Sequence, residues 1–277
     1  MSGKSSVTVI VLNWNGRELL EDCLGSLEKV DYNHFNILVV DNGSTDDSVE
    51  YVTSTFPNVD ILELNENLGF AAGNNAGFKH AVLAYNMKFV IFLNNDTIVD
   101  ENFIKSLLLP FNDLTVGQTA PKIFYESEKE KIWYAGGKVN LWTGNIFHEG
   151  IRKIDTERFK KIKNTDYATG CCFCIKTSDF EKLNGFDESF RMYGEDVDLS
   201  LRVMKSGKNV IFIPESKIYH KVSASIGGAF SLQKIKRKGL ANMKLMFKYA
   251  QPYQWLVQLI CLPFLIFKGI VTYFRYR

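Results

Sequence analysis

The carboxyl-terminal part of the sequence lacks acidic residues: after Glu215 there is no Asp or Glu, although the whole chain contains 31. Residues 216–277 hold eleven Lys and Arg side chains. Because the whole chain has a net charge of +2, residues 1–215 carry −9. A basic tail with many apolar and aromatic residues on an acidic body suggests an anionic partner, and membrane lipid is the first candidate.

Cysteine is scarce as well, with five residues in the chain. The odd count excludes a disulfide framework, as does the crowding of Cys171, Cys172 and Cys174 in one predicted strand, 167–175. Their spacing is not that of a zinc site either. We therefore expect reduced cysteines in a cytoplasmic protein. The short polar segment before Val7 has no signal-peptide pattern.

The sequence has no apolar run long enough to cross a membrane. A spanning helix needs about 20 apolar residues, whereas the run at 255–267 has 13 residues and includes Gln258 and Pro263. We expect this helical region to lie in the membrane interface; packing onto the rest of the chain or onto a partner chain is the alternative. Nucleic acid is not expected as a partner, because the basic residues alternate with apolar ones and form no known binding module.

Short apolar runs alternate with helical patterns in the first part of the chain. Such short, continuous runs are typical of strands buried on both faces. The alternation predicts a Rossmann-like α/β fold, a mostly parallel sheet flanked by helices. One domain is expected over 1–225 and a helical, basic and apolar extension over 226–277. The first four predicted strands are 7–12, 36–40, 59–64 and 89–93.

Each of these predicted strands ends in small polar residues, and in a parallel sheet such ends meet at one edge. A single polar end is a turn signal, because Asn and Asp favour turns. Four of them on one edge instead describe a cleft for a polar ligand. The fourth strand leads into Asn94, Asn95 and Asp96. A carboxylate at this point can hold a metal ion, which in turn can bind phosphates.

A glycine-rich segment precedes the fourth strand, with Gly69, Gly73 and Gly77 at four-residue intervals. This spacing matches neither the dinucleotide fingerprint nor the P-loop. Two interpretations stay open. The glycines allow the backbone to approach a ligand at a helix N-terminus, or they allow a helix to pack tightly on the sheet.

Further candidate residues lie in the second half of the chain. Glu195 and Asp196 begin a predicted helix, where the macrodipole favours their charge. With Asp198 nearby, they exceed what capping requires, which favours a catalytic role. His220 lies beyond the last predicted strand, 209–213, and a lone histidine is more often structural. The irregular segment 110–165 contains aromatic residues that can stack on a sugar ring or simply pack in a β-rich core.

Five motifs in this order resemble the family 2 glycosyltransferases, which have the GT-A fold. The resemblance covers about residues 6–225, and within the family the chain looks most like the bacterial rhamnosyltransferase-type members that build O-antigen and other surface polysaccharides. The motifs are Val-Val-Asp-Asn-Gly-Ser-Thr-Asp at 39–46, Asn-Leu-Gly-Phe-Ala-Ala-Gly-Asn-Asn at 67–75, Asn-Asn-Asp-Thr at 94–97, Gly-Phe-Asp-Glu at 185–188 leading to Gly-Glu-Asp-Val-Asp-Leu at 194–199, and His220.

The resemblance implies a role for each motif. Asp96 matches the last acid of the metal motif, His220 a histidine that completes the metal site, and Asp196 the catalytic base, with Glu195 beside it. Asn94 stands where the metal motif has its first Asp, so metal affinity would depend more on the donor diphosphate and on the histidine. The residues expected to bind the nucleotide are Asn13, Asn15, Asp41, Asn67, Gly69, Asn74 and Asn95. Those assigned to the acceptor are Trp142, Thr169 and Gly170.

The activity implied is that of a metal-dependent, inverting glycosyltransferase. Its donor would be a nucleotide diphosphate sugar such as dTDP-rhamnose or a UDP-sugar, and its cofactor Mn²⁺ or Mg²⁺. Its acceptor would be a glycan, carried on polyprenyl diphosphate at the inner face of the plasma membrane. Two other functions stay open: a catalytically silent sugar- or lipid-binding subunit, and a nucleotidyltransferase. The carboxylates and histidine named above argue against the first, and the lack of a basic glycine-rich loop at 13–16 against the second.

Overall fold

The apolar runs form the centre of one large sheet. The computed structural model describes residues 7–190, 192–222 and 232–275. The first four strands are parallel and lie in the order β3-β2-β1-β4. These strands are β1 (Val7–Asn13), β2 (Phe35–Asp41), β3 (Asp60–Glu63) and β4 (Phe89–Asn94). The helices that connect them are α1 (Arg17–Leu27), α2 (Ser48–Thr55) and α3 (Phe70–Ala84).

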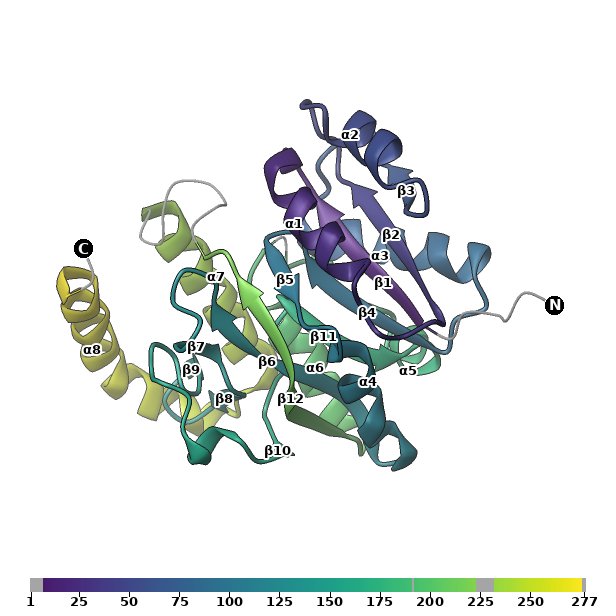
Figure 1. Ribbon diagram of the computed structural model, residues 1–277. Coiled ribbons are helices and arrows are strands. Elements are labelled where there is room, and N and C mark those ends of the chain that lie inside the picture. Colours follow the sequence, from purple (N-terminus) through teal and green to yellow (C-terminus); the bar gives the residue numbers. More distant parts are fainter. Residues whose placement is uncertain (1–6, 191, 223–231, 276–277) are drawn as a thin grey trace.

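The second half of the chain extends the same sheet (Figure 1). β11 joins β4 in antiparallel orientation, and β6 and β12 follow as a parallel pair. The predicted mixed α/β fold with a mostly parallel sheet is therefore confirmed. The remaining strands are β5 (Thr97–Val99), β6 (Val116–Tyr125), β7 (Ile132–Tyr134), β8 (Gly137–Asn140), β9 (Asn145–His148), β10 (Lys163–Asn164), β11 (Cys172–Lys176) and β12 (Asn209–His220). The helices of this half are α4 (Phe103–Leu108), α5 (Thr177–Lys182) and α6 (Glu195–Lys205), with short 3-10 turns at Leu109–Asn112 and Glu157–Phe159.

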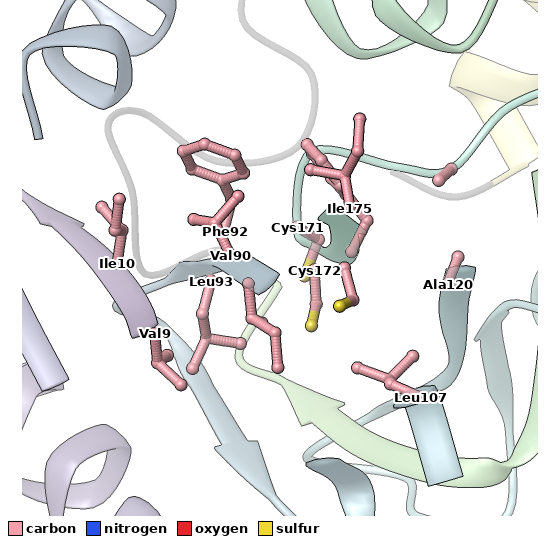
Figure 2. Packing of buried hydrophobic residues seen from close by; sticks show 14 of the residues in the cluster. Val9, Ile10, Val90, Phe92, Leu93, Leu107, Ala120, Cys171, Cys172 and Ile175 are labelled. Carbon is pink, nitrogen blue, oxygen red and sulfur yellow. The ribbon is translucent and has the colours of Figure 1, made fainter. Parts of the chain in front are cut away.

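The core is centred on β4 and β11, where side chains pack on both faces of the sheet (Figure 2). Phe92 is fully buried, and its ring centroid lies 5.2 Å from that of Phe173 and 5.1 Å from that of Phe186. Cys171 and Cys172 are buried free thiols, and their sulfur atoms lie on the other face of the sheet, with Leu93. Burial on both faces explains why these strands appear in the sequence as continuous apolar runs.

Two strand predictions were wrong at their ends. β11 begins at Cys172 and not at 167, because residues 169–171 form a tight loop in which Cys172 N donates to Thr169 O. β12 does not stop at 213 but continues to His220. The register of its pairing with β6 shifts between Ile213 and Lys217, so the strand passes through a bulge and then resumes.

Two helices, α7 (Leu232–Tyr249) and α8 (Pro252–Arg275), form the predicted helical extension. α7 buries Leu245, Met246 and Tyr249 against the rest of the chain. α8 contacts the β8–β9 hairpin near its start, where Gln258 Nε2 donates to Leu141 O at 2.7 Å, and then extends away from the sheet (Figure 1). The predicted boundary at 225/226 lies outside the described residues. No helix within those residues combines the length and the hydropathy needed to cross a bilayer.

Candidate active site

Polar side chains from three parallel strands are hydrogen-bonded to one another at the carboxyl edge of the sheet. Asn95 Nδ2 donates to Asn13 Oδ1 at 2.7 Å, and Asn13 Nδ2 donates to Asp41 Oδ1 at 3.3 Å. Asp41 Oδ2 accepts from the Ser44 amide at 2.9 Å. A Cβ at Gly16 would lie 2.4 Å from Asn95 Nδ2, so only glycine leaves room for this arrangement. The structure thus brings together Asn13, Asp41 and Asn95.

Asn15 links the loops that follow β1 and β2. Its side-chain Oδ1 accepts from the Thr45 backbone amide at 2.7 Å, and its backbone amide donates to Ser44 Oγ at 2.9 Å. Asn67 holds the next loop, since its Oδ1 accepts from Asn42 Nδ2 at 3.2 Å and from the Gly69 amide at 2.9 Å. These bonds place the loops side by side along the edge where a nucleotide is expected.

The glycines of the 67–77 segment have two different functions. Gly69 has a φ of +85° at the N-terminus of α3, a conformation that favours glycine. A Cβ at Gly73 would lie 2.7 Å from Leu12 Cδ1, and one at Gly77 would lie 2.4 Å from Val40 Cγ2. The last two glycines therefore let α3 pack closely on β1 and β2. Asn74 is buried and donates to the Phe70 carbonyl at 3.0 Å, so its amide group is used within α3.

Asp96 and His220 form a buried pair, although they lie 124 positions apart in the sequence. The pairing of β5 with β12 sets His220 opposite Thr97, and Lys221 N donates to Asp96 O at 2.8 Å. His220 Nε2 lies 3.1 Å from Asp96 Oδ2. Asp96 Oδ1 and His220 Nδ1 are buried without a hydrogen-bond partner.

This pair has the chemistry of a partial metal site. Carboxylate oxygen and imidazole nitrogen both bind Mn²⁺. The unpartnered Asp96 Oδ1 and His220 Nδ1 are available as metal ligands. Over the described part of the chain, no group of three or more His, Cys, Asp or Glu is placed to hold a metal ion. The residues therefore fit a divalent cation that takes its other ligands from a bound molecule or from water.

An aromatic wall stands beside this pair. The Trp133 ring centroid lies 4.5 Å from that of His220 and also 4.5 Å from that of His148. The ring centroids of Tyr134 and Tyr167 lie 5.2 Å and 5.8 Å from that of His148. Burial lowers the pKa of His148 to about 3, so its imidazole is neutral at physiological pH.

Glu195 and Asp196 begin α6 directly after Gly194, which has a φ of +90°. Asp196 Oδ2 accepts from the Gly170 amide at 2.8 Å, and Oδ1 accepts from the Val197 amide at 2.8 Å. Glu195 is buried, and its Oε2 has no hydrogen-bond partner. Asp196 is thus fixed in orientation by two backbone donors, whereas Glu195 is mainly desolvated.

The different surroundings of the two carboxyl groups favour the neutral form of one and the anion of the other. Burial and the neighbouring charge of Asp196 raise the pKa of Glu195 to about 8. Burial also raises the pKa of Asp196, but the Gly170 and Val197 amides oppose this by stabilising the anion. Desolvation therefore favours a proton on Glu195, while the two amides favour the anion of Asp196. Such a separation of pKa values is typical of acid–base sites.

The loop before β11 connects Asp196 of the carboxylate pair to the end of β4, which leads to Asp96 of the Asp96–His220 pair. Gly170 N donates to Asp196, and the next residue, Cys171, accepts from the Asn94 amide at 2.9 Å. Burial raises the pKa of the Cys171 thiol, and the charges of Asp96 and Asp196 add to this effect because both lie near it. The structure thus brings Asp96, His220, Glu195, Asp196, Thr169 and Gly170 together at one edge of the sheet.

Trp142 is not part of this group. It lies in the turn of the β8–β9 hairpin, is 51% exposed, and its ring centroid is 5.4 Å from that of Tyr253 in α8. Trp133, which was not among the residues assigned to the acceptor, is the tryptophan beside His220. The sequence pattern of this glycine-containing segment could not show which tryptophan reaches the site, because the position of Trp133 depends on the pairing of β7 with β6.

Asp198 has a structural role that its place in the first turn of α6 does not indicate. Its fully buried carboxylate accepts from Arg202 Nε at 2.8 Å, Lys248 Nζ at 2.6 Å and Tyr249 Oη at 2.6 Å. Two of these donors belong to α7, so the third acid of the 195–198 cluster attaches α7 to α6 (Figure 1).

Two families of sugar-transferring proteins match this chain. Residues 8–183 match the family described as "Glycosyl transferase family 2", and residues 150–224 match "N-terminal domain of galactosyltransferase". The chain belongs to glycosyltransferase family 2. The resemblance drawn from the five motifs is therefore confirmed.

Individual relatives agree with this family. The chain is 28% identical over 233 residues to the O-antigen biosynthesis protein RfbC of Myxococcus xanthus, covering 80% of this chain and 18% of RfbC. It thus spans less than a fifth of that relative's length. It is 26% identical over 238 residues to the N-acetylglucosaminyl-diphospho-decaprenol L-rhamnosyltransferase of Mycobacterium tuberculosis, with 79% of this chain and 77% of the relative covered.

Among solved structures, the mannosyltransferase PcManGT from Pyrobaculum calidifontis, determined with GDP-Man and Mn²⁺, superposes with a TM-score of 0.65. The match covers 94% of this chain and 70% of that one at 18% identity. At this identity the likeness concerns the fold, which is the GT-A fold predicted from the sequence.

Proposed function

We propose that this chain transfers a sugar from a nucleotide diphosphate sugar to a hydroxyl group of a glycan acceptor during synthesis of a cell-surface polysaccharide. The observation that carries the proposal is the carboxyl group of Asp196, which accepts from the Gly170 amide at the same sheet edge as the Asp96–His220 pair. The names of the relatives support O-antigen-type synthesis and a rhamnosyl donor such as dTDP-rhamnose, with a UDP-sugar as the other choice.

The proposed reaction is a single displacement. The acceptor hydroxyl oxygen forms a bond to the anomeric carbon while the bond from that carbon to the donor phosphate breaks, which inverts the configuration. Asp196 takes the hydroxyl proton, as a general base must. Glu195 keeps its proton and so adds no second negative charge beside the base.

The remaining groups hold the donor and the acceptor. A divalent cation, Mn²⁺ or Mg²⁺, would be held by Asp96 and His220 and would supply charge neutralisation for the departing diphosphate. Asn13, Asp41 and Asn95 would orient the nucleotide, together with the loops of Asn15, Asn67 and Gly69. Thr169 and Gly170 would position the acceptor next to Asp196.

Asp96→Ala and His220→Ala are expected to raise the concentration of Mn²⁺ or Mg²⁺ needed for half-maximal activity by about 10-fold or more, since outer-shell changes alone cost 10–100-fold in metal affinity. Metal titrations of nucleotide release measure this. Asp22→Ala is the matched control, because it removes a carboxylate that pairs with Lys221 at the surface next to His220. An unchanged metal requirement in both variants would remove Asp96 and His220 from the site.

A panel of dTDP-, UDP- and GDP-sugars with either metal tests the activity itself, with released nucleotide as the readout. Metal-dependent release from one donor, stimulated by a glycan acceptor, supports the proposal. Binding without release would favour a silent sugar- or lipid-binding subunit. Formation of a nucleotide sugar from a nucleoside triphosphate would favour a nucleotidyltransferase.

The carboxyl-terminal region is proposed to hold the protein on the inner face of the plasma membrane, as a cytoplasmic, peripherally bound enzyme. The division into a catalytic domain over 1–225 and a membrane-associating region over 226–277 stays a prediction. Membrane attachment is supported by an apolar surface on α8. The exposed side chains there include Leu256, Leu259, Ile260 and Phe264, each at least 66% exposed. Lys and Arg side chains of α7 add attraction to anionic lipid. The lipid-linked acceptor would lie at the same surface.

Leu259→Glu and Phe264→Glu are expected to release the protein from phosphatidylglycerol vesicles. Each change replaces an apolar side chain that would insert into the lipid with a negative charge. Co-sedimentation measures the bound fraction. Leu83→Glu is the matched control: Leu83 is 90% exposed but lies on α3. Undiminished binding of both α8 variants, or an equal loss in the control, would contradict membrane attachment through α8.

A further inference from the structure

α7 carries a basic side chain to the edge of the catalytic pair. Its carboxyl-terminal half is attached to α6 through Asp198, Lys248 and Tyr249. Ten residues earlier, about 15 Å along the helix, Lys238 Nζ lies 5.2 Å from the ring centroid of Tyr193. Tyr193 is separated from Glu195 only by Gly194. The attachment therefore positions Lys238 next to the start of α6.

The charge of Lys238 acts on the site. Burial raises the pKa of Asp196, and the positive charge of Lys238 is one of the influences that lower it again. The same charge contributes to the low pKa of His148, after burial. The positive charge of Lys238 therefore acts on both Asp196 and His148, as expected for a cation at the start of α6.

The position of α7 also connects two parts of the proposed reaction. One end of the acceptor must reach Asp196, and a lipid carrier must reach the exposed apolar side chains of α8, such as Leu259 and Phe264. α7 lies directly before α8 in the chain and contacts α6. The diphosphate is bonded directly to the acceptor sugar, so with the sugar at Asp196 it would lie close to the start of α6, where Lys238 is placed. An ammonium group is a suitable phosphate ligand there.

We propose that Lys238 binds the diphosphate of a polyprenyl-diphosphate-linked acceptor and thereby sets the acceptor sugar against Asp196. This inference rests on the proposed sugar transfer to a lipid-linked acceptor and adds the residue that recognises the acceptor diphosphate. It also gives a reason for the Asp198 attachment, which holds the basic face of α7 in place.

Binding of farnesyl diphosphate, measured by calorimetry in EDTA, tests the proposal without turnover. Without divalent metal, a metal-dependent diphosphate site for the donor does not contribute. Lys238→Gln is expected to weaken binding by about 10-fold, the loss of one charge-assisted hydrogen bond. Lys236→Gln is the matched control: it removes the same charge from the same helix, about 200° around the axis, and should bind within twofold of wild type. Equal binding by Lys238→Gln and wild type, or equal losses in both variants, would overturn the proposal.

Two further measurements distinguish recognition of the acceptor diphosphate from attraction to lipid headgroups. The ratio of kcat/KM for a diphosphate-linked acceptor to kcat/KM for an alkyl glycoside of the same sugar should fall about 10-fold in Lys238→Gln, and not in Lys236→Gln. Phosphatidylglycerol vesicles should bind both variants equally; a loss confined to Lys238→Gln there, with farnesyl diphosphate binding intact, would assign the lysine to lipid headgroups instead. If wild-type protein releases no nucleotide from any donor, the proposed function fails, while the calorimetric result still decides the role of Lys238.

Discussion

Asp196→Asn is expected to lower the rate of sugar transfer by about 10²–10⁴-fold, the usual contribution of a general base. The substitution keeps the size of the side chain and an oxygen that can accept from Gly170, but it removes the charge that attracts the proton. Nucleotide release at saturating donor and acceptor measures the effect. Activity at the wild-type level would exclude Asp196 as the base.

Glu195→Gln is the informative control for this prediction. Because the pKa of Glu195 is raised to about 8, its carboxyl group is neutral at pH 7, and glutamine reproduces both the shape and the neutrality. We expect the loss of rate at pH 7 to stay below about 10-fold, less than the range typical of a general base. If Glu195→Gln is the more damaging change, the two carboxyl groups have exchanged roles, with Glu195 acting as the base.

Asp198→Ala is expected to destabilise the protein by about 3–5 kcal/mol, because it leaves buried or half-buried cations without their anion. For a chain of this size the unfolding temperature should fall by roughly 10 °C. The same change should loosen α7, since Lys248 loses one of its two carboxylate partners and Tyr249 loses its side-chain acceptor. Thermal unfolding monitored by circular dichroism gives the first quantity, and limited proteolysis between α6 and α8 gives the second.

Asp187→Ala provides the comparison for Asp198. It removes the other carboxylate bonded to Lys248, at 2.8 Å, but its side chain is 29% exposed. A partly exposed ion pair contributes about 0–1 kcal/mol, so the unfolding temperature should change little. Equal effects of the two variants would show that burial of Asp198 is not what attaches α7.

The residues of the candidate site that follow the first-half strands were predictable from the sequence, because the end of each strand is marked by polar residues after an apolar run. Asn13, Asp41 and Asp96 each follow a continuous apolar run, and parallel strands bring such ends to one edge. The arrangement of the second half was not predictable in this way. His220 reaches Asp96 only because β12 continues through a bulge and pairs with β5, and neither the bulge nor a three-residue strand has a clear sequence pattern.

By itself, the sequence determined the alternation of strands and helices in the first half of the chain, the polar edge and the family, since all of these depend on local patterns. Only the tertiary structure decided how the acids of the 195–198 cluster differ. In the sequence they are equivalent carboxylates at the start of one helix. In the fold, two backbone amides orient Asp196, burial keeps a proton on Glu195, and two cations and a phenol surround Asp198. The charge and the role of a carboxyl group are set by the groups packed around it, and these come from distant parts of the chain.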